Sequence, residues 1–249
     1  MYGVYNERDQ FGNTLYPKSN VSRVGTISKN YVTDNLIFHL DARNPDSYPG
    51  TGSTWYDLSG NNYNGTLVNG PTYNSANEGS IFFDGTNDHV TLPSGFANFT
   101  GGLTIEAWVY STNNNSFGRI IDLSSGVNSG NILLSRDSSN NDMAIYIYTT
   151  SFTSLATTST QYPINQWAHW VATANGTTWV IYKNGSSVAT LTTSILPTNV
   201  TRTVNYIARS VYNDPYFQGN ISIERMYDRA LSASEVLQNY NAEKSRYGL

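Results

Sequence analysis

The strongest constraint on the fold is a set of short segments in which apolar and polar residues alternate at every second position. The clearest is residues 36–41, and similar alternation returns at residues 104–110, 143–148 and 179–182. Successive side chains of a β-strand point to opposite faces, so this period predicts half-buried strands. Many short strands separated by turns favour a β-sandwich.

A hairpin is predicted between two of these strands. Asn184-Gly185 separates the apolar segment 179–182 from a second one at residues 188–191. A type I′ turn needs positive φ at both central residues, and Asn followed by Gly meets this need at little cost. We therefore expect two adjacent antiparallel strands here.

One short helix is predicted near the C-terminus. Ser232 and Glu235 have the spacing of a capping box, and Leu231 is placed to pack against Val236 across the first turn. An apolar stripe continues beyond them, which favours a helix that packs as a lid on the sandwich rather than a free one.

The order of the segments resembles a known family. The segments are residues 36–41, 55–66, 81–88, 206–209 and 217–232. Together they resemble the laminin-G-like branch of the concanavalin A-like lectin/glucanase superfamily. The resemblance implies an all-β fold, a two-sheet antiparallel jelly-roll sandwich, as one domain over residues 34–249. It is less informative about function, because one fold hosts many activities.

Residues 1–33 differ from the rest of the chain. They show no sustained period but are rich in aromatic residues, which are uncommon in disordered tails: Tyr2, Tyr5, Phe11, Tyr16 and Tyr31. We interpret them as an extended N-terminal arm that attaches the sandwich to a partner protein.

Composition excludes several classes of function. A net charge of −4 with only 14 Lys and Arg residues lacks the basic patch of a nucleic-acid-binding protein. No apolar run approaches the roughly 18 residues of a membrane span, so membrane insertion is not predicted. The first residues have neither a basic start nor an apolar run, so no secretory signal is predicted. The sequence contains no cysteine, so the fold is expected to stand without disulfides.

No catalytic residues are predicted. Retaining glycosidases need two carboxyls about 5 Å apart, and glucanases of the superfamily carry a Glu-x-Asp-x-x-Glu strand pattern that this sequence lacks. Glu224 and Asp228 are the one glutamate-centred pair of carboxylates four residues apart. The three histidines lie outside any nucleophile or metal motif. Glycoside hydrolysis is therefore a minor alternative.

A structural Ca²⁺ is the one cofactor considered. Ca²⁺ binds carboxylate and amide oxygens, and in similar laminin-G-like domains it often lies where the first strand, an Asp-x-Ser-Gly-Asn turn and the last strand meet. The resemblance places this site at Asp41, Asp57, Asn61 and Asp228, with Asp84 and Asp88 as a weaker second cluster. The alternative is that these residues only bond their own turns.

Aromatic residues in turn-rich segments are the candidate ligand-binding residues. Aromatic rings stack on sugar CH groups while amides and carboxylates bind hydroxyls. The candidates are Trp55, Tyr56, Tyr63, Tyr212, Asn213, Asp214 and Tyr216, with the loop 212–216 favoured. A protein–protein contact is the alternative. The other tryptophans lie in predicted strands and are expected in the core.

These observations lead to one function hypothesis and its rival. The first is a non-enzymatic virion surface protein of a tailed phage, a capsid decoration or tail-associated protein. Residues 1–33 would contact capsid or tail proteins, and outward loops would bind glycans. The rival is an exported, extracellular carbohydrate-binding or adhesion module. A homo-oligomer is compatible with both, and the sequence does not select an oligomeric state.

Overall fold

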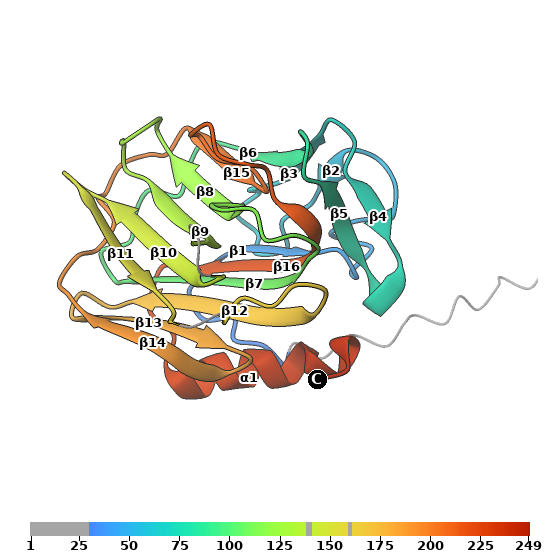
Figure 1. The fold of residues 1–249 in the computed structure, drawn as a ribbon. Helices are drawn as coiled ribbons and strands as arrows, with labels where there is room; N and C mark the ends of the chain where they lie inside the picture. The colour runs from blue at the N-terminus through green and yellow to red at the C-terminus, as the bar shows by residue number, and fades with distance from the viewer. Residues whose placement is uncertain (1–29, 138–140, 159–160) are drawn as a thin grey trace, which may run out of the picture.

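The computed structural model describes residues 30–137, 141–158 and 161–249. They form a sandwich of two antiparallel sheets with one α-helix on an outer face (Figure 1). The all-β, two-sheet prediction and the C-terminal helix are confirmed. Most of the predicted arm, residues 1–29, lies outside the described residues.

The first sheet, called the covered sheet below, has eight strands. In spatial order they are β14 (Ser186–Thr192), β13 (Thr178–Lys183), β12 (Trp167–Ala174), β7 (Leu103–Ser111), β16 (Gln218–Tyr227), β5 (Ser80–Asp84) and β4 (Thr72–Asn74), and β1 (Leu36–Asp41) pairs with β16.

The second sheet, called the open sheet, also has eight strands. They are β11 (Phe152–Ala156), β10 (Met143–Tyr148), β9 (Ile132–Arg136), β8 (Arg119–Ser124), β15 (Val204–Ile207), β6 (His89–Leu92), β3 (Gly65–Val68) and β2 (Thr54–Trp55).

The core lies between the sheets and follows the alternation of the strands. From β7, Ile105 and Ala107 face inward, while Glu106 between them faces the other side with the helix. From β10, Met143, Ile145 and Ile147 join the same cluster. A single apolar core therefore holds the sheets together, and each sheet keeps an outer face with its own chemistry.

The predicted hairpin is confirmed. Asn184 and Gly185 have φ of 49° and 79° between β13 and β14. The Asn184 side chain accepts a hydrogen bond from the His169 backbone N–H (2.9 Å), which ties the turn to β12.

The helix covers the covered sheet. Helix α1 (Ala233–Glu243) begins with the predicted capping box between Ser232 and Glu235, and a 3₁₀ turn, η2 (Lys244–Tyr247), follows it. A second 3₁₀ turn, η1, spans Ala76–Glu78. Trp108 on the outer side of β7 stacks on Tyr240 and Tyr247, at 5.8 and 4.2 Å between ring centroids. The last turns of the chain are thus a packed lid.

The end of the predicted arm belongs to the folded domain. Val32 is buried, and its backbone N–H donates to Asn239 of α1 (2.8 Å) while its carbonyl accepts from the Tyr227 hydroxyl (2.9 Å). The Tyr31 ring lies 4.1 Å from the Arg225 guanidinium. Residues 30–33 therefore lie on the outer face of the covered sheet, in contact with α1.

A buried arginine joins several loops at one end of the sandwich. Arg202 is fully buried, and its guanidinium donates to the carbonyls of Gly130 (2.7 Å), Phe96 (2.5 Å), Thr198 (3.1 Å) and Val200 (3.3 Å). Burial lowers its pKa to about 10. Backbone carbonyls rather than carboxylates satisfy this cation.

Across the described ranges, none of the helices has the length and apolar character needed to cross a membrane.

Candidate functional site

The predicted calcium residue Asp57 organises a turn. One carboxylate oxygen accepts from the backbone N–H groups of His39 and Ser59 (2.9 Å each). The other accepts from the Tyr63 N–H (3.0 Å) and the Ser59 hydroxyl (2.8 Å). Four donors surround this carboxylate, as the turn-chemistry alternative predicts.

The other three predicted ligands lie apart from one another. Asp41, at one end of β1, bonds Arg246 (3.3 Å), whereas Asp228 lies beyond the opposite end of β1 and accepts from Asn35 (2.8 Å). Asn61 donates to the Ile37 carbonyl (3.0 Å). The four residues therefore do not converge on one position, and no group of three His, Cys, Asp or Glu suited to a metal occurs in the described part of the chain. Calcium binding stays a prediction.

The weaker cluster also makes local contacts. Asp88 accepts from the backbone N–H of Asp84 (3.2 Å), and Asp84 accepts from the N–H of Thr86 (2.8 Å). The three N–H groups that bond Asp84 lower the pKa of its carboxyl, while partial burial raises that of Asp88. These two side chains close the turn between β5 and β6.

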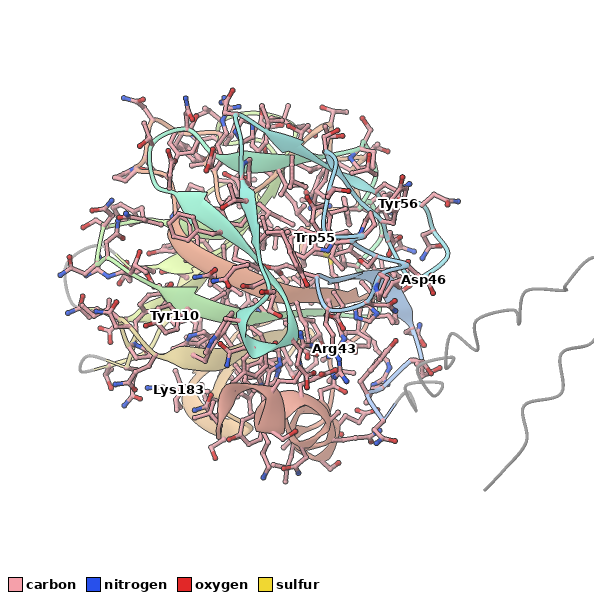
Figure 2. All side chains as sticks on the ribbon, turned by 90° about the vertical axis from the view of Figure 1, so that its right-hand side faces the viewer. Arg43, Asp46, Trp55, Tyr56, Tyr110 and Lys183 are labelled. Carbon is pink, nitrogen blue, oxygen red and sulfur yellow. The ribbon has the colours of Figure 1, made fainter. Side chains whose placement is uncertain are left out.

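Trp55 corrects the prediction of an exposed sugar platform. Its side chain is 0% exposed and belongs to the core between the sheets (Figure 2). Its neighbour Tyr56 is 45% exposed. Tyr63 stacks on Phe96 at 4.3 Å and packs against the core. The turn-rich surroundings suggested exposure for all three, but the burial of a large indole outweighs its local context.

The favoured loop 212–216 does contribute to a pocket. Tyr212 and Asp214 line it, whereas Asn213 is exposed and Tyr216 lies beside His89, 6.0 Å between ring centroids. Two of the four candidate side chains in this loop therefore line the pocket, and their role in ligand binding stays a prediction.

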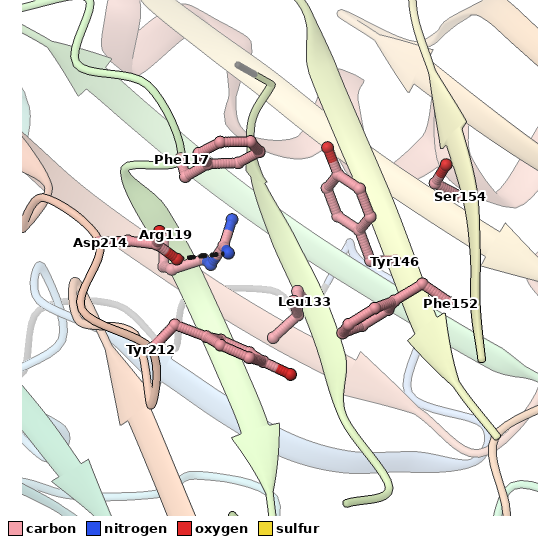
Figure 3. A pocket seen from close by; sticks show the side chains of 8 residues that line it. All are labelled: Phe117, Arg119, Leu133, Tyr146, Phe152, Ser154, Tyr212 and Asp214. Atoms are coloured by element: carbon pink, nitrogen blue, oxygen red, sulfur yellow. Dashed lines mark hydrogen bonds and ion pairs between the residues drawn. The ribbon is translucent and has the colours of Figure 1, made fainter. Parts of the chain in front are cut away.

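The pocket is a hollow of about 280 Å³ on the outer face of the open sheet (Figure 3). This is close to the lower end of the roughly 300–1,000 Å³ typical of small-molecule sites. Its wall consists of side chains from β8, β9, β10, β11 and two loops: Phe117, Arg119, Leu133, Tyr146, Phe152, Ser154, Tyr212 and Asp214. Most of that wall is aromatic or aliphatic, with one cation and one carboxylate.

Alternation places these side chains together. In β9, Ile132 and Leu134 enter the core, so Leu133 between them faces outward. In β10, Ile145 and Ile147 enter the core, so Tyr146 faces outward in the same way. Neighbouring strands in register then bring outward residues side by side.

Arg119 is the polar centre of the pocket. Its guanidinium donates to Asp214 (2.7 Å) and to the Ser135 hydroxyl (2.9 Å), and it lies 5.3 Å from the Phe117 ring centroid and 6.0 Å from that of Tyr146. The Arg119 side chain is 6% exposed and that of Asp214 is 21% exposed. The arginine is held rigidly, and the carboxylate is the more accessible partner.

The aromatic groups of the wall are also fixed. The Tyr146 hydroxyl donates to Asp137 (2.5 Å), and burial together with this carboxylate raises the pKa of Tyr146. Tyr212 donates its hydroxyl to Asn128 (3.0 Å). Phe117 has a φ of 59°, a strained value for a bulky residue. Such strain is concentrated at functional sites.

A buried carboxyl supports the loop from behind. Asp122 accepts from the Val211 backbone N–H (2.8 Å), and the single proton of the Ser210 hydroxyl is shared between Asp122 (3.4 Å) and Asp214 (3.1 Å). Burial is the main cause that raises the pKa of Asp122 to about 6. Asp122 therefore positions the segment that carries Tyr212 and Asp214.

Sequence reasoning missed most of this wall. Tyr146 lies in a strand that its alternation predicts, and an aromatic residue at an outward-facing position of that strand was the signal for a binding surface. Arg119 and Phe117 carry no local signal, because their role depends on Asp214, which is 95 residues away from Arg119.

The sequence matches a family model over residues 84–237, described as the concanavalin A-like lectin/glucanases superfamily. The match covers more than half of the chain and all the residues that line the pocket. The chain belongs to this superfamily. The resemblance stated from the sequence is thus confirmed, and the fold is lectin-like.

Solved structures with the same fold include a domain in complex with a sugar and a toxin binding domain. Domain 4 of AbnA, an extracellular arabinanase from Geobacillus stearothermophilus solved with arabinotriose, has a TM-score of 0.65 at 17% identity, covering 83% of this chain and 98% of that one. The binding domain of Paraclostridial Mosquitocidal Protein 1 has a TM-score of 0.66 at 17% identity, with coverages of 84% and 52%.

A third similar structure is the binding domain of Botulinum Neurotoxin DC in complex with SialylT, with a TM-score of 0.61 at 16% identity and coverages of 85% and 52%. This chain spans about half of both toxin binding domains. At these identities the similarity shows the fold alone. No curated protein sequence matches the chain.

Proposed function

We propose that this protein is a non-enzymatic glycan-binding module that binds sugar in the pocket of the open sheet. The observation that carries the proposal is the pocket itself: Tyr146, Phe152 and Tyr212 surround the Arg119–Asp214 pair in one hollow. Sugars present apolar CH faces and a ring of hydroxyls, so a site needs both aromatic surface and fixed polar groups.

Each part of the wall has a role in this proposal. Phe152 is 40% exposed on the edge strand β11 and offers a ring face to stack on a sugar. Tyr212 makes a tilted contact with Phe152, 6.2 Å between centroids, so the two rings form one platform. Asp214 offers an acceptor to sugar hydroxyls, and the buried Arg119 fixes its position.

The carboxylates support a binding role rather than hydrolysis. Glu224, the buried member of the pair noted in the sequence, lies inside the sandwich, and burial raises its pKa well above the ordinary value. Asp228 lies beyond the end of β16, next to Asn35. A glycosidase needs two carboxyls on one cleft, and these two do not share one.

The test compares two exposed aromatic residues. Phe152→Ala removes the pocket platform, and Tyr56→Ala removes a ring of similar exposure away from the pocket (40% and 45%). On a glycan array followed by titration calorimetry, Phe152→Ala should weaken binding about fivefold, since one stacked ring contributes about 1 kcal/mol. Tyr56→Ala should bind like the unaltered protein. Equal loss in both variants, or loss in neither, contradicts the pocket as the site.

A second observation bears on where the module acts. Residues 30–33 lie on the covered sheet, and the pocket lies on the outer face of the open sheet, on the opposite side of the sandwich. An attachment through residues 1–33 would therefore present the pocket away from the attached particle. This arrangement supports the hypothesis of a virion surface protein of a tailed phage, with capsid or tail proteins as partners.

The rival location is the extracellular space, as an exported carbohydrate-binding module. Cosedimentation of the full chain with particles from the source culture, beside a chain lacking residues 1–29, distinguishes the two. Association that depends on residues 1–29 supports the virion role, and a chain that ignores particles yet binds glycans supports the exported module. Light scattering of the same samples gives the oligomeric state.

A further inference from the structure

The pocket contains one positive charge, and that charge is already paired. Among the residues that line it, Arg119 is the sole cation, and its guanidinium donates to Asp214 at 2.7 Å. A second donation goes to Ser135 at 2.9 Å. A carboxylate on a ligand would have to displace Asp214 to reach this arginine.

Two further carboxylates lie behind the wall of the pocket, and the cation nearest to one of them, Arg136, interacts with Asp137 and does not line the pocket. Asp137 accepts from the Tyr146 hydroxyl, and Asp122 lies behind the loop that carries Asp214. Above its raised pKa of about 6, Asp122 adds a further negative charge. An incoming carboxylate would meet like charges and lose its water without gaining a free cation, which is unfavourable.

An uncharged sugar meets no such penalty. One oxygen of Asp214 takes both the Arg119 and the Ser210 hydrogen bonds, and the other accepts no hydrogen bond from the residues that the structure describes. With its side chain 21% exposed, this carboxylate can accept from a sugar hydroxyl. Hydrogen bonds to an ionised acceptor are the stronger kind.

We propose that the pocket selects uncharged sugars over sugars that bear a carboxylate, and that Asp214 sets this selectivity by occupying Arg119. The inference rests on the proposed glycan-binding function and specifies its ligand class. Specificity of this kind comes from repulsion of the wrong ligand as much as from attraction of the right one.

The experiment uses matched probe pairs. Each pair is an oligosaccharide ending in a neutral hexose and the same oligosaccharide ending in the corresponding uronic acid, which differ only in the carboxylate at C6. The full chain should bind the neutral member at least about tenfold more tightly, the size of effect that about 1.4 kcal/mol produces.

Asp214→Asn then leaves the charge of Arg119 unneutralised while keeping the shape of the side chain. In this variant the preference should move at least about tenfold toward the acidic member. Asp46→Asn is the matched control, because Asp46 is exposed in a loop at the end of β1 and its loss changes the net charge equally. Its preference should equal that of the unaltered protein.

A salt titration gives a measurement that does not depend on the variant folding. Raising the salt from about 0.1 to about 1 M shortens the Debye length from about 10 to about 3 Å. Binding of the neutral probe by the unaltered protein should change by less than about twofold, because no net charge is neutralised.

The outcomes separate the inference from the function. Tight binding of the uronic acid member by the unaltered protein, an unchanged preference in Asp214→Asn, or a strong salt dependence overturns the selectivity while glycan binding stands. Absence of binding to both members across the probe panel overturns the glycan-binding function, and the selectivity with it.

Discussion

The two outer faces of the sandwich use the same kind of ion pair under different cover. On the covered sheet, Arg225 is 0% exposed and bonds Glu106 and Glu243 at 2.8 Å each, beneath α1 and Tyr31. On the open sheet, Arg119 bonds the partly exposed Asp214 and borders a hollow. On the covered sheet both carboxylates are paired with a buried arginine, whereas the open pair keeps an acceptor free for a ligand.

The surroundings of each carboxylate on the two faces determine its pKa. Burial alone would raise the pKa of Glu106, but the adjacent Arg225 and the bonds from His169 and Asn239 lower it to about 2. The low pKa keeps this carboxylate charged and paired at any ordinary pH. At the other face, burial raises the pKa of Asp122 to about 6, although the nearby Arg119 opposes this shift. Glu106 on the covered face therefore keeps its charge at any ordinary pH, whereas the charge of Asp122 on the open face changes with pH.

The largest expected effect comes from breaking the covered network. Arg225→Met leaves the buried Glu106 without its arginine and Glu243 with Arg246 alone (3.3 Å), which should lower the free energy of unfolding by about 3–5 kcal/mol. Urea denaturation measures this loss. The double variant with Glu106→Gln should recover part of it, because one uncompensated charge is removed.

The matched change on the open face sharpens the contrast. Arg119→Met should cost only about 1 kcal/mol, because water can solvate the partly exposed Asp214. Similar losses for Arg119→Met and Arg225→Met would mean that cover does not govern the strength of these pairs.

The next effect is a pH dependence at Asp122. A carboxyl whose pKa is higher in the folded than in the unfolded protein stabilises the fold in its neutral form. That contribution is full below the ordinary value of 3.8 and is lost as the pH rises through about 6. The shift corresponds to at most about 3 kcal/mol.

Asp122→Asn removes this titration but keeps an acceptor for the Val211 N–H. From about pH 4 to about pH 7, the free energy of unfolding of the unaltered protein should therefore fall relative to that of the variant. Parallel stability curves for the two proteins would show that Asp122 does not titrate in this range.

The smallest effect concerns calcium. Removal of an ion that binds only the folded protein lowers the stability of the fold. At Asp57, however, four protein donors already surround the carboxylate, and the other predicted ligands lie elsewhere. We expect excess chelator to shift the melting temperature by less than the roughly 2–4 °C that 1 kcal/mol produces. A larger fall would restore the calcium hypothesis at this turn.

The elements of the fold could be predicted because their signals are local. Alternation in residues 36–41, the Asn184-Gly185 turn and the Ser232 capping box each depend on a few neighbouring residues. The order of such segments was enough to identify the superfamily. Trp55 is the exception, because its burial depends on how strands far apart in the sequence close over it.

The pocket could be predicted only in part because it is assembled across strands. Tyr212 and Asp214 lie in a loop with visible aromatic and polar character, but Arg119 and Phe152 acquire their role from register and from partners distant in the sequence. Asp57 shows that one pattern can predict two structures, since its carboxylate accepts hydrogen bonds from its own turn and calcium binding there stays a prediction.

The contacts of Arg202 bear on the conditions in which this protein can work. Its guanidinium donates to carbonyls in three segments of the chain, near residues 96, 130 and 198–200. In many secreted domains a disulfide cross-links such segments. The chain has no cysteine, so this cross-link consists of hydrogen bonds, which a thiol reductant does not break. The sandwich should consequently keep the same melting temperature in reducing and oxidising buffer.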